Sequence, residues 1–240
     1  MSLKSLSSSC KNALYIGALV LIIYPTPFYR LFVPIVSGTR MVEPLTESVD
    51  VIEKLDNPSK FELERQHHSY ILRPRKKYQV YGRIIDIDRY HGLWEKFAHD
   101  YDNGRMIYNA LSPLDLVIGH GQMADKNYLK NFKFTHEYRL MWWKPLKPIE
   151  YTSFQHLFNN YHIIPATPRI ALATRTLMRG DMIFLKGLLV DVKSPDYTWW
   201  ELSTGGDYNE WHKEFYGGQY ATKCFILYVQ ELRVNNYLYK

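Results

Sequence analysis

Carboxylates and aromatic rings gather in one stretch of the C-terminal third, where together they could act on a carbohydrate. The acids are Glu201, Asp207, Glu210 and Glu214. Paired carboxylates perform glycoside hydrolysis, and aromatic faces stack on sugars or bases. Any exposed aromatic loop contains similar residues, so the stretch predicts polymer binding more strongly than hydrolysis. The binding candidates here are Trp199, Trp200, Tyr208, Trp211 and Tyr216.

Two further features present side chains suited to binding. His120 is flanked by Gly119 and Gly121, and such a turn can present an imidazole openly for acid–base chemistry. A turn that needs unusual backbone angles explains the same glycines, and we favour the turn. An expected strand carries Trp142 and Trp143, which join the candidates for partner or polymer contact.

Metal and nucleophile patterns are absent from the sequence. His156 and His162 lie six positions apart with no evident third ligand, whereas a metal-binding pair on a helix is spaced by four. No serine-nucleophile motif, phosphate-binding glycine loop or dinucleotide fingerprint occurs. We therefore expect no catalytic residue, no bound metal and no cofactor.

The chain has two cysteines, Cys10 and Cys224. Cys224 stands in an apolar run that is typical of a strand, and a buried thiol is its simplest interpretation. If a membrane lies between the two cysteines, they cannot form a disulfide. No zinc pattern and no C-x-x-C motif is present.

Dense positive charge occurs at one place. The chain has a net charge of +6, and its basic run comprises Arg73, Arg75, Lys76 and Lys77. Such a run can bind the phosphates of nucleic acid or of anionic lipid. It is more often a solvated loop or strand edge, so it predicts a basic patch without naming a ligand.

An apolar segment near the N-terminus, residues 13–36, determines the expected organisation. Between Ala13 and Tyr29 the only plainly polar side chain is Thr26, and about 20 residues cross a bilayer as a helix. We expect a transmembrane anchor, with a cleaved signal peptide and a buried core helix as alternatives. The expected parts are a tail at 1–12, the anchor at 13–36, a linker at 37–60 and a soluble β-rich domain at 61–240.

The charges beside this segment indicate its orientation. Lys4 and Lys11 precede it without any acid, whereas Arg30 and Arg40 follow it together with acids. The excess of positive charge on the cytoplasmic side of membrane proteins favours an N-terminus inside and a domain outside. In a bacterium this is a single-pass inner-membrane protein whose soluble domain is periplasmic.

The residues after the linker predict a mostly β fold. Tyr70 to Asp88, Asp181 to Lys193 and Thr222 to Val234 are typical of strands, and a Thr-Pro pair at 167–168 predicts a helix start. Gly187 inside the second strand suggests a bulge or a bend. The pattern predicts a small β-barrel or sandwich, OB-like or SH3-like, with short helices, behind one N-terminal transmembrane helix.

Three blocks of the sequence resemble a group of bacterial membrane-associated proteins that has no assigned activity. The blocks are S-P-L-D-L through G-H-G-Q-M at 112–123, H-I-I-P-A at 162–166, and G-D followed by L-K-G-L-L-V at 180–190. His120 stands where that group has tryptophan. The resemblance spans about residues 70–235, and it implies a bacterial, single-domain, β-rich protein without implying a mechanism.

Three functions fit these features. The first is an accessory or structural component of a bacterial envelope complex, which acts through protein–protein contacts of its soluble domain. The second is a binder or hydrolase of envelope polysaccharide such as peptidoglycan, which uses the aromatic stretch. The third is a membrane-tethered nucleic-acid-binding barrel, which uses the basic run and requires a cytoplasmic domain. We favour the first, because no catalytic motif accompanies the anchor and the aromatic residues.

Overall fold

The computed structural model describes residues 40–41, 50–56, 58–90, 108–137, 139–148, 157–195, 201–202, 215–216, 219–221, 224–234 and 236–240. Side chains are described for all of these except residues 40–41, 50–51, 137, 201–202, 215–216 and 219–221. The expected anchor, residues 13–36, lies outside the described residues. None of the helices in the described ranges has both the length and the apolarity that a membrane span requires.

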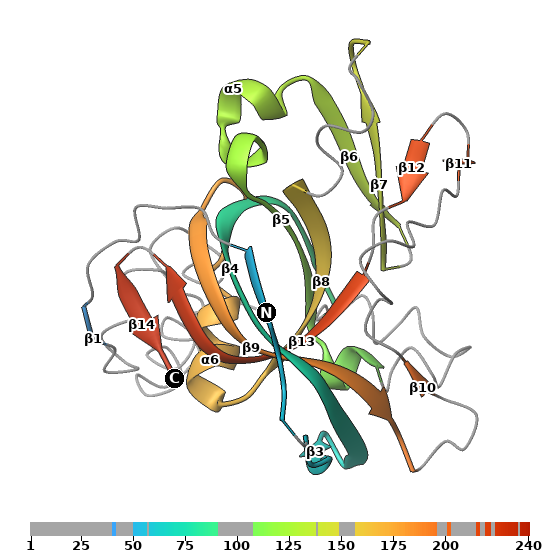
Figure 1. Ribbon diagram of the computed structural model, residues 1–240, viewed down its shortest axis with the longest axis vertical. Coiled ribbons are helices and arrows are strands. Elements are labelled where there is room, and N and C mark those ends of the chain that lie inside the picture. Colours follow the sequence, from blue (N-terminus) through green and yellow to red (C-terminus); the bar gives the residue numbers. More distant parts are fainter. Residues whose placement is uncertain are drawn as a thin grey trace, which may run out of the picture.

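The described part of the chain is mostly β, as the sequence predicts, and its larger sheet is mixed (Figure 1). Five strands form the centre of this sheet: β4 (His68–Arg89), β5 (Leu114–Gly119), β8 (Phe158–Pro165), β9 (Met182–Lys193) and β13 (Cys224–Val234). They pair in a closed ring, in the order β4, β5, β8, β13, β9 and back to β4. The pairing of β8 with β13 is parallel, and the other four pairings are antiparallel.

Short strands extend this ring. β2 (Asp50–Lys54) and β3 (Phe61–Arg65) pair with β4, β10 (Glu201–Leu202) pairs with β9, and β14 (Tyr237–Tyr239) pairs with both β13 and β1 (Arg40–Met41). Two of them, β1 and β2, fall within residues 37–60, the range assigned to the linker.

The inside of the ring is apolar. All five strands contribute to one buried cluster, in which Leu116, Tyr161 and Leu227 are fully buried. Alternate residues of a strand point to opposite faces, so burial of the apolar set specifies the register of each strand. The hydroxyl groups of Tyr78 and Tyr161, both in this cluster, hydrogen-bond to each other at 2.7 Å.

Gly187 lets β9 approach β13 closely. A Cβ atom at this position would lie 2.0 Å from the carbonyl oxygen of Tyr228, so a larger residue would force the two strands apart. The pairing of the two strands changes register between Val229 and Glu231, directly opposite Gly187. The irregularity predicted at Gly187 therefore occurs in this strand pair, with the extra residue on β13 rather than on β9.

The helix predicted after Thr167 is confirmed. α6 (Pro168–Thr174) connects β8 to β9, and the Thr167 side chain accepts a hydrogen bond from the backbone N–H of Ile170. A threonine cap followed by proline at the first helical position is a favoured helix start. Ile170 and Ala173 then pack into the apolar cluster inside the ring.

A second, four-stranded sheet stands at one end of the ring (Figure 1). The connection from β5 to β8 supplies β6 (Phe132–Glu137) and β7 (Leu140–Pro145), and the connection from β9 to β13 supplies β11 (Phe215–Tyr216) and β12 (Gln219–Ala221). Two short helices, η2 (Gly121–Ala124) and α5 (Lys126–Leu129), precede β6. The Asp125 side chain accepts a hydrogen bond from the backbone N–H of Asn127 and so caps α5.

Candidate functional site

Three neighbouring strands place polar side chains on the outer face of the ring. Asp115 on β5 lies opposite His162 on β8, and Asn160 on β8 lies beside Cys224, the first residue of β13. Because Asp115 alternates with Leu114 and Leu116 of the inner cluster, it points outward. Asp115 and Asn160 are fully buried, and His162 is 6% exposed. With Arg139, described below, these four residues form what we call the polar cluster.

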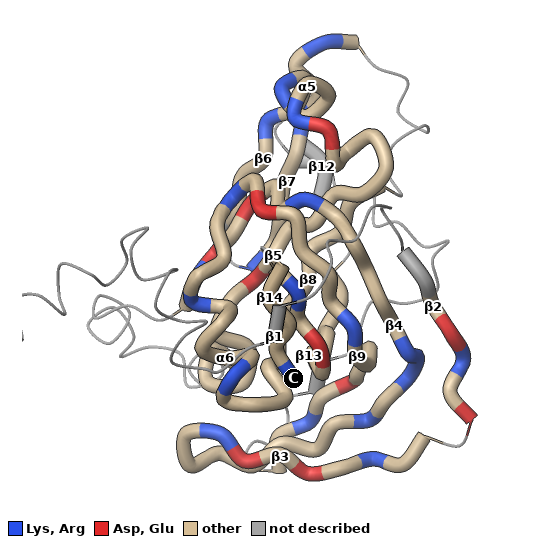
Figure 2. Tube along the Cα trace, turned by 90° about the vertical axis from the view of Figure 1, so that its left-hand side faces the viewer, with Lys and Arg blue, Asp and Glu red and all other residues tan. Residues whose placement is uncertain are grey.

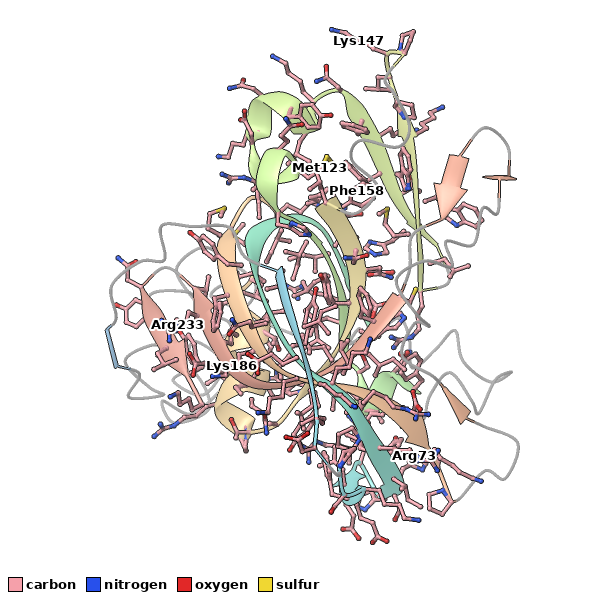
Figure 3. The ribbon with its side chains drawn as sticks, viewed as in Figure 1. Arg73, Met123, Lys147, Phe158, Lys186 and Arg233 are labelled. Atoms are coloured by element: carbon pink, nitrogen blue, oxygen red, sulfur yellow. The ribbon has the colours of Figure 1, made fainter. Side chains whose placement is uncertain are left out.

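Apolar side chains enclose the polar cluster on two sides. Along the outward positions of β8, Phe158 packs with Met123 and Trp143, whereas Ile164 packs with Ile226 in another cluster. Asn160 and His162 lie between these two apolar contacts. Met123 and Phe158 are labelled in Figure 3, where they lie between the ring and the second sheet. Asn160 and His162 are therefore excluded from bulk water by packed hydrophobic neighbours.

Asp115 is the centre of a buried ion network. Its Oδ1 atom lies 2.8 Å from His162 Nδ1 and 3.0 Å from Arg139 Nη1. Its Oδ2 atom accepts a hydrogen bond of 2.9 Å from the hydroxyl group of Tyr90. A buried carboxylate costs several kcal/mol of desolvation free energy unless partners of this kind offset it.

Arg139 reaches the cluster from the turn between β6 and β7. Its backbone has a positive φ of 63°, which is uncommon for a residue other than glycine. The guanidinium group donates to the carbonyl oxygen of Ser112 at 2.8 Å and to the side chain of Asn109. It also lies 3.7 Å from the ring centre of Tyr90 and 4.1 Å from that of Tyr108. These contacts tie the second sheet to the outer face of the ring.

The ion pair between Asp115 and His162 shifts the pKa values of both groups. Burial lowers the pKa of His162, but the Asp115 carboxylate and Cys224 raise it, and the result is a pKa of about 10. Burial raises the pKa of Asp115, but His162 and Arg139 lower it, and the net pKa is below its usual value. At neutral pH the cluster therefore holds one carboxylate against an imidazolium and a guanidinium.

A second ion group adjoins the first. Asp86 on β4 is 3% exposed, lies 3.1 Å from His136 Nδ1, and forms an ion pair with Arg179. Burial lowers the pKa of His136, but the hydrogen bond to Asp86 raises it, and the net pKa is above its usual value. The other ring nitrogen of His136 lies 3.4 Å from the side-chain oxygen of Asn160. Asn160 thus connects the two groups.

Cys224 lies at the partly exposed rim of the polar cluster. Its Sγ atom is 3.7 Å from the amide nitrogen of Asn160 and 3.8 Å from the carbonyl oxygen of Arg139. The side chain is partly exposed, which corrects the expectation of a buried thiol.

The structure describes the side chains of three binding candidates that the aromatic and glycine patterns predict, namely Trp142, Trp143 and His120. Trp143 is 1% exposed and packs edge-to-face on Phe158 at 5.4 Å, so it belongs to the core of the second sheet. Trp142 is partly exposed on the same strand. His120 is partly exposed, and Gly121 has a φ of +54°, which confirms the turn that the glycines predict.

The aromatic stretch of the C-terminal third lies largely outside the described residues. This applies to Trp199, Trp200, Tyr208 and Trp211, whereas Tyr216 belongs to β11. Because β11 pairs with β12 and β12 pairs with β7, the strands of Tyr216 and Trp142 belong to one sheet. His156 also lies outside the described residues. Among the described side chains, no group of three could hold a metal ion.

The basic run lies within β4, and its side chains do not form a single patch. The register of β4 against β9 shifts between Pro74 and Lys76. Arg73 lines a cavity of about 200 Å³ with Lys60 and Lys193, and Lys77 lines another of about 310 Å³ with Lys186. Arg75 forms an ion pair with Asp191, and Lys76 is partly exposed. Figure 2 shows basic and acidic residues interspersed along the described trace.

Sequence patterns did not reveal the polar cluster. Its members come from separate segments, and the strand that carries Asp115 is buried along its whole length. The sequence contains one signal of the cluster, which is the single acid, Asp115, in an otherwise apolar strand. A buried carboxylate needs hydrogen-bonding or charged partners, so such an acid indicates that partners lie nearby. No family model, curated protein or solved structure matches the chain, and the resemblance to bacterial membrane-associated proteins stays a prediction.

Proposed function

We propose that the chain is a membrane-tethered accessory component of a bacterial envelope complex, in which an OB-like barrel carries a sheet that contacts a partner protein. The order of the ring supports the OB-like assignment. Numbered along the chain, the first to fifth ring strands are β4, β5, β8, β9 and β13. The third and fifth strands are parallel, the first pairs with the fourth, and α6 joins the third to the fourth. Such barrels bind ligands over the second and third strands and over the first–second and fourth–fifth connections.

The observation that carries the proposal is the origin of the second sheet. β6 and β7 are inserted between the second and third ring strands, and β11 and β12 come from the fourth–fifth connection. Half of the sheet, β11 and β12, therefore belongs to the fourth–fifth connection, which is one of the elements at which OB-like barrels bind their ligands. It exposes Leu146 at 57% and Leu140 at 37%, near the partly exposed Trp142. Aromatic and large apolar side chains of this kind are typical contact residues at protein interfaces.

Site-specific photo-crosslinking in native membranes tests this proposal. A photoreactive residue at Leu146, beside Lys147 at the outer end of the sheet (Figure 3), should yield one discrete adduct with a membrane or periplasmic protein. The same probe at Met178, which is 46% exposed and lies between α6 and β9, is the matched control and should yield none. No adduct at Leu146, or equal adducts at both positions, would contradict the proposal.

The location of the domain is part of the same proposal. Residues 13–36 are proposed as a retained anchor, with the soluble domain in the periplasm. A reporter fused after Lys240 that is active only outside the cytoplasm should be active. Activity of a reporter that works only in the cytoplasm would instead favour the nucleic-acid alternative, for which Lys60, Arg73 and Lys193 line one cavity together with Asp191.

Polysaccharide binding is the second candidate, because one sheet contains the strands of both Trp142 and Tyr216. An aromatic surface on this sheet would stack on sugar rings. Co-sedimentation of the intact protein with purified peptidoglycan should weaken several-fold on Trp142→Ala. The change Leu140→Ala, on the same strand, is the control and should leave binding unaltered. Absence of binding by the unmodified protein removes this candidate.

A further inference from the structure

Three cationic side chains from three segments of the chain converge on one small cavity. Its volume is about 200 Å³, and it is lined by Lys60, Ile71, Arg73, Asp191, Val192 and Lys193. Arginine and lysine side chains are the usual protein partners of phosphate. We propose that this cavity, which we call the basic cavity, binds a single phosphate group, carried either by a soluble phosphate ester or by a lipid headgroup.

The register of the strands brings the cations together from distant parts of the sequence. Arg73 on β4 lies opposite Asp191 on β9, and Lys193 follows on β9 two positions later, where it shares the face of Asp191. β3 pairs with β4 so that Lys60, the residue before β3, continues the pairing beside Arg73. Neighbouring strands are about 4.8 Å apart, so the three cations belong to one side of three adjacent segments.

The carboxylate in the lining is already bound by another cation. Asp191 is 3% exposed and pairs with Arg75, whose Nε and Nη2 atoms both contact it. Four cations therefore surround one carboxylate, and three positive charges remain for a ligand. Within the described part of the chain, the ion pairs do not include Lys60, Arg73 or Lys193. Cations that lie together repel one another, and a bound anion removes this repulsion.

The size of the basic cavity and its surroundings indicate a small anionic group and argue against nucleic acid. Pockets that enclose drug-sized ligands have volumes of about 300–1,000 Å³, so the basic cavity admits only part of a larger molecule. Sites for single-stranded nucleic acid combine cations with aromatic side chains, and none of the residues that line this cavity is aromatic. Two acids also flank it, because Glu62 lies opposite Ile71 and Glu201 lies opposite Lys193. A long polyanion would run past these acids, whereas a single group would not.

The geometry of the donors favours phosphate over carboxylate. The guanidinium group of Arg73 is a planar fork that fits two oxygen atoms of one anion. Lys60 and Lys193 approach from the neighbouring strands and add compact positive charges. A phosphate group presents up to three charged oxygen atoms to these three side chains, whereas a carboxylate presents two.

The basic cavity is separate from the surface that is proposed to contact a partner protein. Arg73 and Lys147, which stands beside Leu146 on the second sheet, lie at opposite ends of the view in Figure 3. Lys60 is the last residue of the range 37–60, which joins the expected anchor to the domain. A lipid headgroup is therefore one source of the phosphate, and a soluble ester is the other. Phosphate binding does not depend on the proposed partner contact.

Calorimetric titration of the full-length protein in detergent tests this proposal. Glycerol 3-phosphate, added at constant ionic strength, should saturate at one molecule per chain. Arg73→Gln and Lys193→Gln should each weaken its binding about tenfold or more, because each removes a charged hydrogen-bond donor. Lys77→Gln and Lys186→Gln are the matched controls, since they remove the same charge from the same two strands but line the other cavity. They should change the affinity by less than about twofold.

Thermal unfolding of the same variants separates lost binding from lost structure. The side chains of Arg73 and Lys193 are exposed, so their replacement should not lower the unfolding midpoint measured without ligand. Glycerol 3-phosphate should raise the midpoint of the unmodified protein, because it binds the folded state, and should leave that of Arg73→Gln unchanged. Glu62→Gln, which removes a flanking acid, should strengthen binding.

A second probe identifies the source of the phosphate. Mixed micelles that contain phosphatidylglycerol present the group on a lipid, and micelles with phosphatidylcholine are the zwitterionic control. Binding of glycerol 3-phosphate alone assigns a soluble ester, binding of phosphatidylglycerol alone assigns a headgroup, and binding of both assigns the phosphate group itself. Saturation by neither probe, or equal weakening by Arg73→Gln and Lys77→Gln, would overturn the proposal.

Discussion

The two faces of β5, β8 and β13 are built from alternate residues of the same strands, but different forces stabilise them. On the inner face, Leu116 and Tyr161 pack with apolar side chains from all five ring strands. On the outer face, their neighbours Asp115 and His162 form an ion pair that is almost as deeply buried. The inner face depends on apolar area, and the outer face depends on matched charge.

This difference determines how each face responds to change. An apolar core loses stability in proportion to the volume removed, and it does so in the same way at every pH. A buried ion network loses far more when one member is removed, because the remaining charge stays buried without a partner. Its stability also varies with pH wherever the pKa values differ between the folded and unfolded states.

The largest effect is expected on removal of the central charge of the outer face. Asp115→Asn leaves the Arg139 guanidinium without its buried carboxylate and forces His162 either to remain a buried cation or to lose its proton, which should lower the free energy of unfolding by about 3–5 kcal/mol. Urea denaturation followed by tryptophan fluorescence measures this loss. Asp125→Asn, at an exposed helix cap, is the control and should cost less than about 0.5 kcal/mol. Equal values for the two variants would contradict a buried ion network.

Truncation of Leu116, the neighbour of Asp115 on the inner face, should lower the free energy of unfolding by a similar or slightly smaller amount. The mechanism is different. Leu116→Ala creates a cavity inside the ring, where the side chain is fully buried, and should lower the free energy of unfolding by about 2–5 kcal/mol. The same urea experiment, repeated at pH 6.5 and pH 9, should find a loss that does not change with pH. A pH-dependent loss would mean that the two faces are coupled.

The pH dependence of stability should separate the two faces further. His162 has a folded-state pKa of about 10, above the value of about 6.5 expected in the unfolded chain. Its contribution is therefore fully present below pH 6.5 and declines as pH rises toward 10. The stability difference between the unmodified protein and His162→Gln should shrink between pH 6.5 and pH 9 in thermal unfolding. A difference that grows over this range would mean that folding lowers the pKa of His162 and does not raise it.

The smallest effect is expected at the rim of the outer face. The Arg179 side chain is 69% exposed, although its partner Asp86 is buried. Asp86 keeps His136 as a second partner, so Arg179→Ala should cost no more than about 1 kcal/mol. The loss should diminish at high salt, because exposed ion pairs are screened. A loss that matches that of Asp115→Asn would place Arg179 inside the buried network.

Local features of the fold were predictable because they depend on neighbouring residues. The run from Asp181 to Lys193 is mostly apolar and typical of a strand, and it forms β9. The Thr-Pro pair at 167–168 starts α6. The order of the strands around the ring was not predictable in this way, since β13 pairs in parallel with β8 from a distant part of the sequence. Non-local pairing of this kind leaves no periodic signal in either segment.

The polar cluster shows the same limit more sharply. In the sequence, His162 stands six positions after His156, and this pair has no evident third ligand. The structure instead pairs His162 with Asp115, which lies on the adjacent strand. Arg139 joins them only because the turn between β6 and β7 folds back over the ring. Charge complementarity between distant segments determines this site, and the spacing of its members along the chain does not predict it.

The ion network of the outer face depends on the ionisation state of His162, which can be measured by itself. Side-chain NMR of the folded protein, with the imidazole nitrogens labelled, should find an imidazolium at pH 7 whose titration midpoint lies near pH 10. In Asp115→Asn the midpoint should fall, because the carboxylate that raises the pKa is gone. A neutral imidazole at pH 7 in the unmodified protein, or a midpoint that Asp115→Asn leaves unchanged, would contradict the account.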